Sequence, residues 1–444
     1  MKNLIKYFVL LTTVSVLSTG CNKELDDAGK NPNQPTSVTP NVLLTSSEVN
    51  VGFVAGGDLS RFEGLIDQQL VANANARQFN VFASYGFKTS DFNSAWQNLY
   101  LSMFNLKDLA DSSKPKGYNK YTGIAWILEA YTLGLTTDVF GDVPFTQALQ
   151  GIGNVQPVVD KQMDIYKSIQ NLLDSGISRL SMSPGNLVPS ADDLVYGGVS
   201  ANWVKLAYAL KARYYLHLKK VDPSATSKAM AALANGFTSN ADDAYIAFGN
   251  GPASAGPWYQ FQQQRSGEIS FVGGTAGTWM SANNDPRLPA FIDTNSANFD
   301  NLGTFYSGTG SGVQIMTYAE QLFIQAELEA TPAAAATDYN NAVTASVNKF
   351  STGSNAAWLA INAGETGSTI SLQKIILQKN IALFLNPETF SDWRRTGYPI
   401  ISPPSSSVAV ARRFYYPQYE INANSNVAAI SNVQLTDRVW WDAP

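Results

Sequence analysis

The sequence contains one cysteine, Cys21, and one histidine, His217, among its 444 residues. A disulfide within the chain is therefore excluded. A zinc site built from histidine and cysteine side chains is excluded as well, because such a site needs several of these ligands. A Ser-His-Asp triad would have to use His217, which lies in line with Leu210 and Tyr214 near the end of an expected helix. We interpret His217 as a partly buried packing residue or as a charge partner of that helix end.

Charged residues are also scarce, at 15% of the chain, and the formal net charge is only -5. No basic field exists to hold nucleic acid, and no run of like charge marks an interaction tail. The apolar segment Phe8–Leu17 is too short to span a bilayer. With 45% hydrophobic residues, the composition is that of a globular protein that binds no nucleic acid.

Motifs of common catalytic and cofactor sites are missing too. The sequence has no phosphate-binding loop, no dinucleotide-binding fingerprint after a strand and no Gly-x-Ser-x-Gly elbow. The glycine-rich segment Gly308–Gly312 precedes no phosphate-binding lysine, so we interpret it as a flexible loop. Five aspartates that we place in loops could form a glycosidase pair or a calcium site, namely Asp58, Asp242, Asp243, Asp285 and Asp300. Because acidic loop residues are common, we predict no catalytic residue, no metal site and no cofactor.

The N-terminus has the pattern of a targeting segment. Lys2 and Lys6 precede the short apolar segment, and Leu17-Ser18-Thr19-Gly20 leads directly into Cys21. This resembles a bacterial lipobox, in which the cysteine is acylated and becomes the new N-terminus, although its leucine stands one place early. We predict a signal peptide at 1–20, lipidation of Cys21 and an acylated, flexible tether at 21–42. The alternative is an ordinary secretory signal that happens to contain a cysteine.

One long helix dominates the rest of the pattern. Lys120–Thr137 is apolar on nearly all sides, which is typical of a helix buried in the centre of a helical domain. Gly123, Ala130 and Gly134 leave little bulk, so neighbouring helices should approach it closely. A tight exit loop, Asp138–Ala148, should follow.

Other stretches also repeat apolar residues at helical spacing. Helices are expected at 43–75, from Ser90 or Asp91, from Asp160, from Ser200, from Thr317 to Ala330, at 333–350 and from Ser371. The named serine, threonine and aspartate residues are the expected N-caps, and Thr317 with Glu320 has the pattern of a capping box. Because these helices come in consecutive pairs, the sequence predicts a mainly α fold of stacked helix pairs.

Three stretches show no helical period: 73–88, 236–312 and the segment after Asn386. We expect loops with short strands or turns in them. So long an irregular stretch as 236–312 is usually functional or disordered. Its many aromatic residues favour an ordered, functional region.

Several motifs, in this order, resemble those of the SusD-like (SusD/RagB) family of outer-membrane nutrient-binding lipoproteins. They are the tether Asn31–Thr36, the helix Asp91–Leu109, the loop Asp138–Phe145 with Gly-Asp-Val-Pro-Phe, the Asp-Pro-Arg of Asn284–Leu288, the helix Tyr318–Glu327, and the C-terminal segments Trp393–Pro399 and Arg413–Pro417. The resemblance covers nearly the whole chain after Cys21.

The resemblance implies a tetratricopeptide-like helix-pair scaffold that holds a large irregular, loop-rich half, in a single SusD-like domain at 43–444. It implies a surface lipoprotein of the outer membrane that sits over a TonB-dependent, SusC-like transporter. Such proteins are not enzymes; they capture oligosaccharides, or in some branches peptides, and pass them inward. Arg287, Arg394 and Glu420 are then expected to be structural ion-pair partners.

A sugar ligand would use aromatic platforms beside amide and guanidinium groups, because sugars present apolar C–H faces and hydroxyls. Two clusters fit this description. The predicted ligand-binding residues are Asn73, Asn75, Arg77, Phe82, Tyr85, Trp258, Tyr259, Phe261, Gln262 and Arg265. Two alternatives stay open: a lipid-anchored glycoside hydrolase that uses two loop carboxylates, and a surface lipoprotein that binds peptides on its helices.

Overall fold

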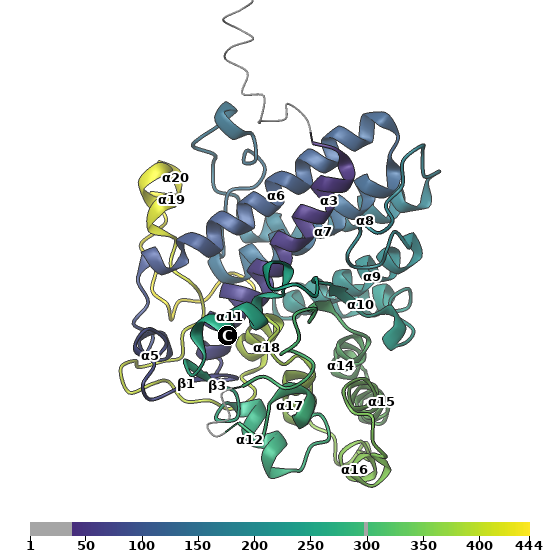
Figure 1. The fold of residues 1–444 in the computed structure, drawn as a ribbon, viewed down its shortest axis with the longest axis vertical. Coiled ribbons are helices and arrows are strands. Elements are labelled where there is room, and N and C mark those ends of the chain that lie inside the picture. Colours follow the sequence, from purple (N-terminus) through teal and green to yellow (C-terminus); the bar gives the residue numbers. More distant parts are fainter. Residues whose placement is uncertain (1–37, 297–300) are drawn as a thin grey trace, which may run out of the picture. The chain divides into compact units, whose positions relative to one another are not determined.

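Helix α7 (Asn119–Phe140) is the central element of the protein, as its sequence predicts (Figure 1). The computed structural model describes residues 38–296 and 301–444. Nearly all side chains of α7 are buried, and α6 (Asn93–Ser113) and α8 (Gln162–Ser181) pack against it. The helix continues to Phe140, three residues beyond the predicted end.

Glycines let the neighbours of α7 come close, which confirms the prediction from residue size. A Cβ atom added to Gly123 would lie 2.7 Å from Leu180 Cγ on α8. One added to Gly134 would lie 2.2 Å from the hydroxyl oxygen of Tyr214 on α9 (Ser200–His217). Both distances are far below van der Waals contact, so any larger residue would push these helices apart.

Helices that follow one another in the chain pack side by side, as predicted: α6 on α7, α7 on α8, α8 on α9, α9 on α10, and α14 on α15. The fold is therefore mainly α. The remaining longer helices are α3 (Pro40–Val54), α4 (Ser60–Ile66), α10 (Ala225–Leu233), α14 (Tyr318–Leu328), α15 (Pro332–Phe350), α16 (Ala356–Asn362), α17 (Leu372–Ala382) and α18 (Glu388–Thr396).

The stretches expected to be loops contain short elements. These are the helices α5 (Arg77–Ala83), α11 (Pro257–Arg265), α12 (Thr275–Ala282), α13 (Leu288–Phe291), α18, α19 (Gln418–Ala423) and α20 (Ser425–Ala428), and the strands β2 (Ala244–Ile246) and β3 (Ile269–Ser270). Strand β1 (Val71–Ala72) falls inside the predicted helix 43–75, and β4 (Val313–Met316) directly follows the stretch 236–312. The strands pair antiparallel, β1 with β3 and β2 with β4. The prediction of loops was wrong for these helices, since each spans too few turns to show a helical period.

The first predicted helix, 43–75, is also shorter and less regular than expected. It begins at Pro40, passes through the π-helix η1 (Ala55–Leu59) and ends with α4 at Ile66. Gly57, inside η1, has the non-helical angles φ -107° and ψ -108°. Such a π-turn inserts an extra residue into the helix and changes the direction in which the following side chains point.

Some predicted N-cap residues have other roles. The first amide of α8, that of Gln162, donates to Asp142 Oδ1 at 2.8 Å. The expected cap, Asp160, instead accepts from the backbone N–H of Phe145 at 2.8 Å and so holds the exit loop of α7. Ser200 begins α9 without a capping hydrogen bond from a side chain. Local sequence cannot distinguish these cases, because the competing acceptors come from other segments.

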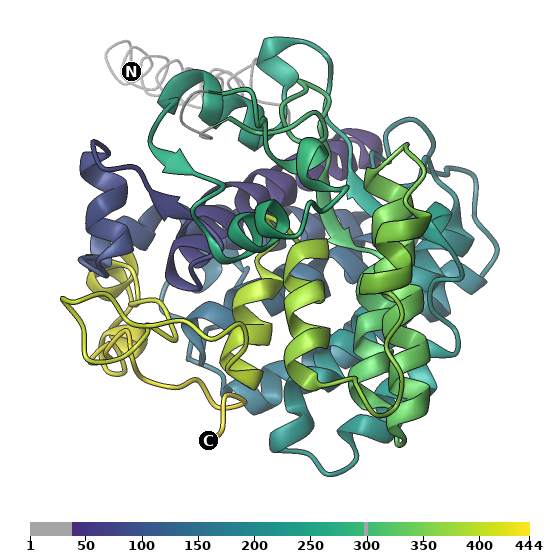
Figure 2. The same ribbon diagram turned by 90° about the horizontal axis from the view of Figure 1, so that it is seen from below.

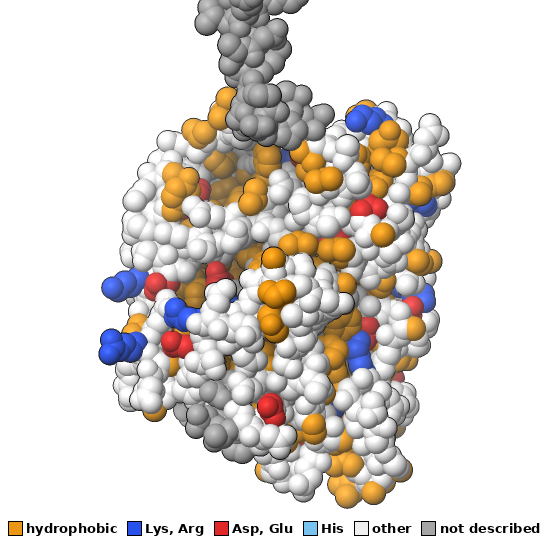
Figure 3. Space-filling model, in the orientation of Figure 1, with side chains coloured by type: hydrophobic (Ala, Val, Ile, Leu, Met, Phe, Trp, Pro, Cys, Tyr) orange, Lys and Arg blue, Asp and Glu red, His pale blue; other side chains and the backbone are white. Residues whose placement is uncertain are grey.

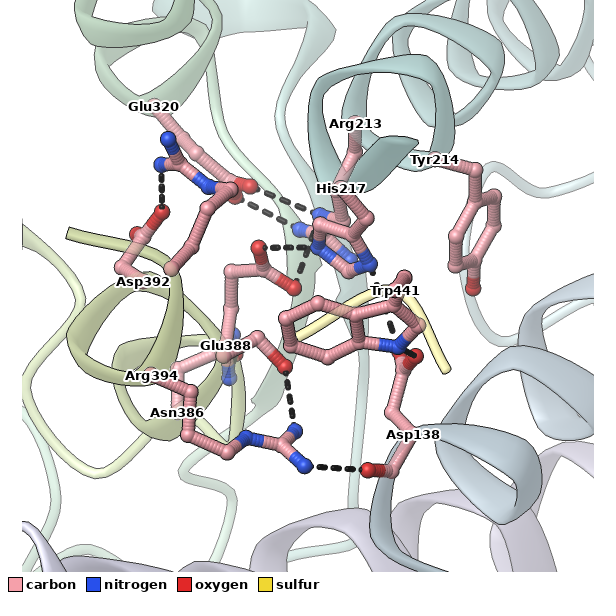
Figure 4. A network of polar contacts seen from close by, with 12 residues as sticks. Asp138, Arg213, Tyr214, His217, Glu320, Asn386, Glu388, Asp392, Arg394 and Trp441 are labelled. Carbon is pink, nitrogen blue, oxygen red and sulfur yellow. Dashed lines mark hydrogen bonds and ion pairs between the residues drawn. The ribbon is translucent and has the colours of Figure 1, made fainter. Parts of the chain in front are cut away.

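A buried network of charged side chains joins four helices around His217 (Figure 4). We call Asp138, Arg213, His217, Glu320 and Glu388 the buried network; they come from α7, α9, α14 and α18. Arg213 makes two hydrogen bonds to the Glu320 carboxylate, of 2.7 and 2.6 Å, while His217 Nε2 lies 2.7 Å from Glu388 Oε1. Glu320 thus turns towards Arg213, so only the Thr317 half of the predicted capping box forms, at 3.1 Å. The network ties the C-terminal third of the chain to the helix pairs.

His217 is fully buried in this network, which corrects the prediction of a partly buried residue. Burial alone would lower its pKa, but the carboxylates of Glu388 and Asp138 raise the pKa to about 9. The geometry fits an imidazolium: Nε2–H donates to Glu388, and Nδ1 lies 2.8 Å from the Tyr166 hydroxyl, which itself donates to Asp138. His217 is therefore a buried cation with a structural function.

Candidate functional site

The structure brings the two predicted ligand-binding clusters together. Strands β1 and β3 place the start of one cluster beside the end of the other, with Val71 opposite Ser270. The side-chain amide of Asn73 donates to Gly267 O at 2.9 Å, and Arg265 Nη2 donates to Gln78 Oε1 at 2.6 Å. Helices α5 and α11 thus lie side by side, although almost 200 residues separate them in the sequence.

Four of the predicted aromatic contacts, however, are core residues: Phe82, Tyr85, Trp258 and Phe261, each 9% exposed or less. Their faces are covered by other groups. Phe82 stacks on Phe87 with ring centroids 4.8 Å apart, and the Tyr85 hydroxyl donates to a backbone carbonyl at 3.0 Å. The expectation of exposed platforms is wrong for these four rings. Sequence alone does not show which face of a loop aromatic meets the core.

The polar members of the clusters lie nearer the surface. Asn75, Arg77 and Arg265 are exposed, and Tyr259 is half-buried. Gln262 donates from its amide to Asn301 Oδ1 at 3.0 Å and accepts from the Leu302 backbone. Together with Asn73, it holds neighbouring loops in place. These six residues remain a prediction as ligand contacts.

A cleft of about 260 Å³ opens directly beside these residues, between the first helix and α11. We call it the α11 cleft. Its lining comes from five elements, α3, η1, α4, α6 and α11, through Phe53, Val54, Gly57, Asp58, Arg61, Asn98, Pro257, Gln260, Phe261 and Gln264. Of these, sequence reasoning identified only Phe261 as a ligand contact.

The shape of the cleft follows from the glycine pair in the first helix. A Cβ atom on Gly56 would lie 2.5 Å from Val313 and 3.0 Å from Pro257, so only glycine lets α11 and β4 pack this closely against η1. The π-turn around Gly57 then presents Asp58 and Arg61 to the cleft. A glycine pair that interrupts an otherwise helical pattern is a signal that could have drawn attention to this place, because π-turns are frequent at functional sites.

Arg61, in the wall of the α11 cleft, is held in place by two contacts. Its Nη2 donates to Asp58 Oδ1 at 2.8 Å, and its guanidinium carbon lies 4.9 Å from the ring centroid of Phe261. Burial lowers the pKa of Arg61, an effect that the Asp58 carboxylate partly offsets. A planar cation fixed in this way offers N–H donors at a defined place and loses little conformational freedom on binding.

Two amides of the cleft have no hydrogen-bond partner among the described residues: those of Asn98 and Gln264. Gln260 differs, since its amide donates to Ala255 O at 2.9 Å. Each free amide offers both a donor and an acceptor, which matches the hydroxyl groups of a sugar. On the face that carries α11, charged side chains are few and separated, and hydrophobic patches lie between uncharged polar ones (Figure 3). The arrangement suits a neutral, polyhydroxylated ligand with apolar faces.

The aspartates that the sequence offered for a glycosidase pair or a calcium site are engaged elsewhere. Ion pairs join Asp58 to Arg61, Asp242 to Lys205, Asp243 to Lys349 and Asp285 to Arg287. Asp300 lies outside the described residues, which contain no group of three or more His, Cys, Asp or Glu able to hold a metal ion. Arg287 is fully buried in its pair, as the family resemblance implied.

The other two residues expected to be structural also have internal partners. Arg394 is buried, donates to the carbonyl oxygen of Asp138 and stacks on Phe390 at 4.2 Å. Glu420 accepts from the Asn424 amide at 3.2 Å. Both side chains therefore have internal partners, but the expected ion pairs are not found among the described residues, where Arg394 and Glu420 form hydrogen bonds instead.

Comparisons with known proteins agree with this fold. Similar solved structures include a SusD/RagB family protein from Bacteroides thetaiotaomicron (TM-score 0.74, 23% identity, 92% of this chain and 99% of that one). A chitin-binding protein has a TM-score of 0.72 and 24% identity, over 91% of this chain and 100% of that one. A chitin-binding SusD homologue from Flavobacterium johnsoniae has a TM-score of 0.73 and 22% identity, over 90% of this chain and 98% of that one.

A family model supplies the assignment that structural likeness alone does not. No curated protein matches the chain. The SusD-like model, described as starch-binding and associating with the outer membrane, matches residues 32–417. The chain therefore belongs to the SusD-like family of carbohydrate-binding proteins that associate with the outer membrane.

Proposed function

We propose that this protein binds a neutral oligosaccharide in the α11 cleft and delivers it to a SusC-like, TonB-dependent transporter. The observation that carries the proposal is the pair of amides, Asn98 and Gln264, that have no partner among residues 38–296 and 301–444, in the same cleft as the fixed guanidinium of Arg61. The family description supports a carbohydrate ligand, and two structurally similar proteins are named as chitin-binding. The protein acts by binding and release, without chemistry of its own.

In this proposal, different side chains of the cleft recognise different parts of the ligand. Phe53 offers a half-buried ring, which also meets Phe248 edge-on with centroids 5.4 Å apart, for the apolar face of a sugar. Asn98, Gln264 and Arg61 exchange hydrogen bonds with hydroxyls. Further sugar units then extend over the rim towards Tyr259 and Arg265.

The other residues predicted to bind the ligand also have roles in this proposal: some contact the ligand directly, and others hold the loops in place. Asn75 and Arg77, both exposed on or just before α5, contact the distal units of a longer chain. Asn73 and Gln262 act by holding the loops that carry these contacts. Of the buried rings, Phe261 forms part of the cleft wall, whereas Phe82, Tyr85 and Trp258 belong to the core.

The location of the protein is part of the proposal. We infer that Cys21 is lipidated and anchors the chain on the outer face of the outer membrane. Cys21, the signal peptide and almost all of the tether lie outside the described residues. No helix of the described part is both long and apolar enough to cross a membrane. Cys21→Ala should release the protein from the membrane fraction, and continued attachment of this variant would contradict the anchor.

Binding can be tested by titration calorimetry with chitin oligosaccharides, malto-oligosaccharides and unrelated peptides. Asn98→Ala and Gln264→Ala should each weaken binding of the preferred saccharide about fivefold, which corresponds to one net hydrogen bond of about 1 kcal/mol. Gln97→Ala, an exposed neighbour on α6, is the matched control and should leave the affinity unchanged.

Each alternative predicts a different result. Binding of peptides but not of saccharides would favour the peptide-binding lipoprotein. Shortening of the saccharides during incubation, abolished by Asp58→Ala, would favour the hydrolase. Saccharide binding that survives Asn98→Ala and Gln264→Ala together would place the ligand elsewhere.

A further inference from the structure

A second cavity, of about 380 Å³, lies between α8, the end of α9 and the C-terminal segment. We call it the Trp440 cavity. Its walls include Met163, Tyr166, Gln170, Asn171, Tyr215 and Trp440, none of which lines the α11 cleft. Figure 2 shows the C-terminal end of the chain at the edge of the view opposite to the irregular segment that carries α11. The volume is in the range of sites for small molecules.

Apolar side chains at the mouth of this cavity remain in water. Trp440 is 39% exposed and Met163 is 42% exposed. The ring of Trp440 meets Tyr166 edge-to-face, with centroids 6.5 Å apart. An indole that stands at the rim of a cavity presents a flat apolar surface, which is the surface that the C–H face of a sugar ring covers well.

Gln170 is a mostly buried polar residue in the wall of the cavity, and one of its polar atoms has no hydrogen-bond partner among the described residues. Its side chain is only 8% exposed, and its amide donates to Lys211 O at 3.3 Å. Its Oε1 accepts no hydrogen bond from the described part of the chain. A buried acceptor without a donor is unfavourable, so a ligand O–H would relieve a defect of the fold once a rotation of the Gln170 side chain turns Oε1, which is closed to solvent here, towards the cavity. The exposed amide of Asn171 lies at the same cavity and can both donate and accept.

The charges around the cavity favour a neutral ligand. Lys228 is paired with Asp222 at 3.1 Å, Lys167 with Asp164 at 2.8 Å, and Lys211 with Asp174 at 2.5 Å. These pairs leave no excess of one sign for an anion. An aliphatic side chain of a protein partner would fill the apolar part but would leave Gln170 without a donor.

We propose that the Trp440 cavity is a second saccharide-binding subsite, in which a sugar ring stacks on Trp440 and a hydroxyl donates to Gln170 Oε1. This inference rests on the proposed function for the class of ligand, but it uses different residues. Because the two sites lie on different elements, a short saccharide should fill them independently.

The test is calorimetric titration of the whole chain, made lipid-free by Cys21→Ala, with a chitin disaccharide and with maltose. We expect two binding sites for the preferred disaccharide. Trp440→Ala should weaken one of them about tenfold or more and leave the other unchanged, whereas Trp440→Phe should largely preserve both. Asn98→Ala should weaken only the other site. If Trp440→Ala does not fold, Asn171→Ala tests the same site with an exposed residue.

The outcomes separate this inference from the proposed function. A single site that is weakened by Asn98→Ala but not by Trp440→Ala or Asn171→Ala would overturn the second subsite and leave the proposed function intact. Two sites that both survive the Trp440 and Asn171 substitutions would overturn the assignment to this cavity. Absence of binding of either disaccharide, and of longer saccharides, would overturn the proposed function and the subsite with it.

Discussion

The buried network around His217 and the α11 cleft both contain several polar side chains, but these regions differ in how far their hydrogen-bonding groups are paired within the protein. In the network, Arg213, Glu320, His217 and Glu388 satisfy one another at distances of 2.6 to 2.7 Å. In the cleft, the amides of Asn98 and Gln264 have no partner in the described part of the chain, while the nearby cation Arg61 is fixed in place.

This difference separates polar residues that build the fold from those that are available to a ligand. A charge that has left water must be paired inside the protein, and removing its partner is costly. A partly exposed amide can bind water until a ligand replaces that water. Substitutions in the buried network should therefore mainly reduce stability, whereas substitutions in the α11 cleft should mainly weaken ligand binding.

The largest effect is expected from Arg213→Ala. This change leaves the carboxylate of Glu320 in the interior without its cation, while Glu388 keeps only His217, and it should reduce the free energy of unfolding by about 3–5 kcal/mol. Urea unfolding followed by circular dichroism would measure the loss. Arg265→Ala, which removes an exposed guanidinium near Glu268, is the control and should change stability by less than about 1 kcal/mol. An equal loss of stability in Arg213→Ala and Arg265→Ala would contradict the view that the buried network stabilises the fold more than exposed charges do.

His217 should make the stability of the protein depend on pH. Its pKa in the folded protein is about 9, above the value of about 6.5 expected in the unfolded chain. Between these values the folded state binds more protons, so the free energy of unfolding should fall as the pH rises from about 6.5 through 9, by a total on the order of 3 kcal/mol. The stabilisation is fully present below about pH 6.5.

The comparison with His217→Gln isolates this contribution. Glu129 titrates in an overlapping range, because burial raises its pKa to about 8. Glu129 affects both curves alike, so the difference between the wild-type and variant curves should shrink as the pH rises from 6.5 to 9. Parallel curves would show that His217 is not a cation in the folded protein.

Gly56→Ala should affect both stability and binding. The added Cβ atom would meet Val313 at 2.5 Å and would push β4 and α11 away from η1. We expect a loss of about 1–3 kcal/mol in the free energy of unfolding, as for other overpacked sites, and weaker saccharide binding. Gly353→Ala is the control, because its nearest neighbouring atom lies 4.0 Å away. Unchanged saccharide affinity in a destabilised Gly56→Ala protein would argue against the α11 cleft as the binding site.

The smallest effect on stability is expected from Asn98→Ala, although this change should weaken saccharide binding. The amide makes no hydrogen bond within the described residues, and alanine favours the helix, so the free energy of unfolding should change by less than about 0.5 kcal/mol. Thermal unfolding of the two proteins side by side would measure it. A large loss of stability would assign Asn98 to the fold rather than to the ligand.

The outline of the fold was predictable because helices longer than about three turns repeat their apolar residues often enough to be recognised. The central helix, its small residues Gly123 and Gly134, and the consecutive helix pairs are all visible in this way. The short helices α5 and α11 were not, since one or two turns carry no distinct period. Family motifs supplied the SusD-like assignment, which the family model confirms.

The site was predictable only as a region. Both aromatic clusters lie together in the structure, but which rings face the core depends on segments far away, as when Phe79 packs on Phe261 with centroids 5.4 Å apart. The cleft itself combines Phe53, Asn98 and Gln264, which no local pattern connects.

Sequence alone thus determined the longer helices, the exclusion of a disulfide and of a histidine–cysteine zinc site, and the family, because each depends on residue identity and short-range spacing. The tertiary structure decided which polar groups are satisfied, from the ion pair between Arg213 and Glu320 to the α11-cleft amides that find no partner in the part of the chain that the structure describes. The physical reason is that hydrogen-bond satisfaction is a property of pairs of atoms brought together by packing, and packing joins residues that are distant in the chain.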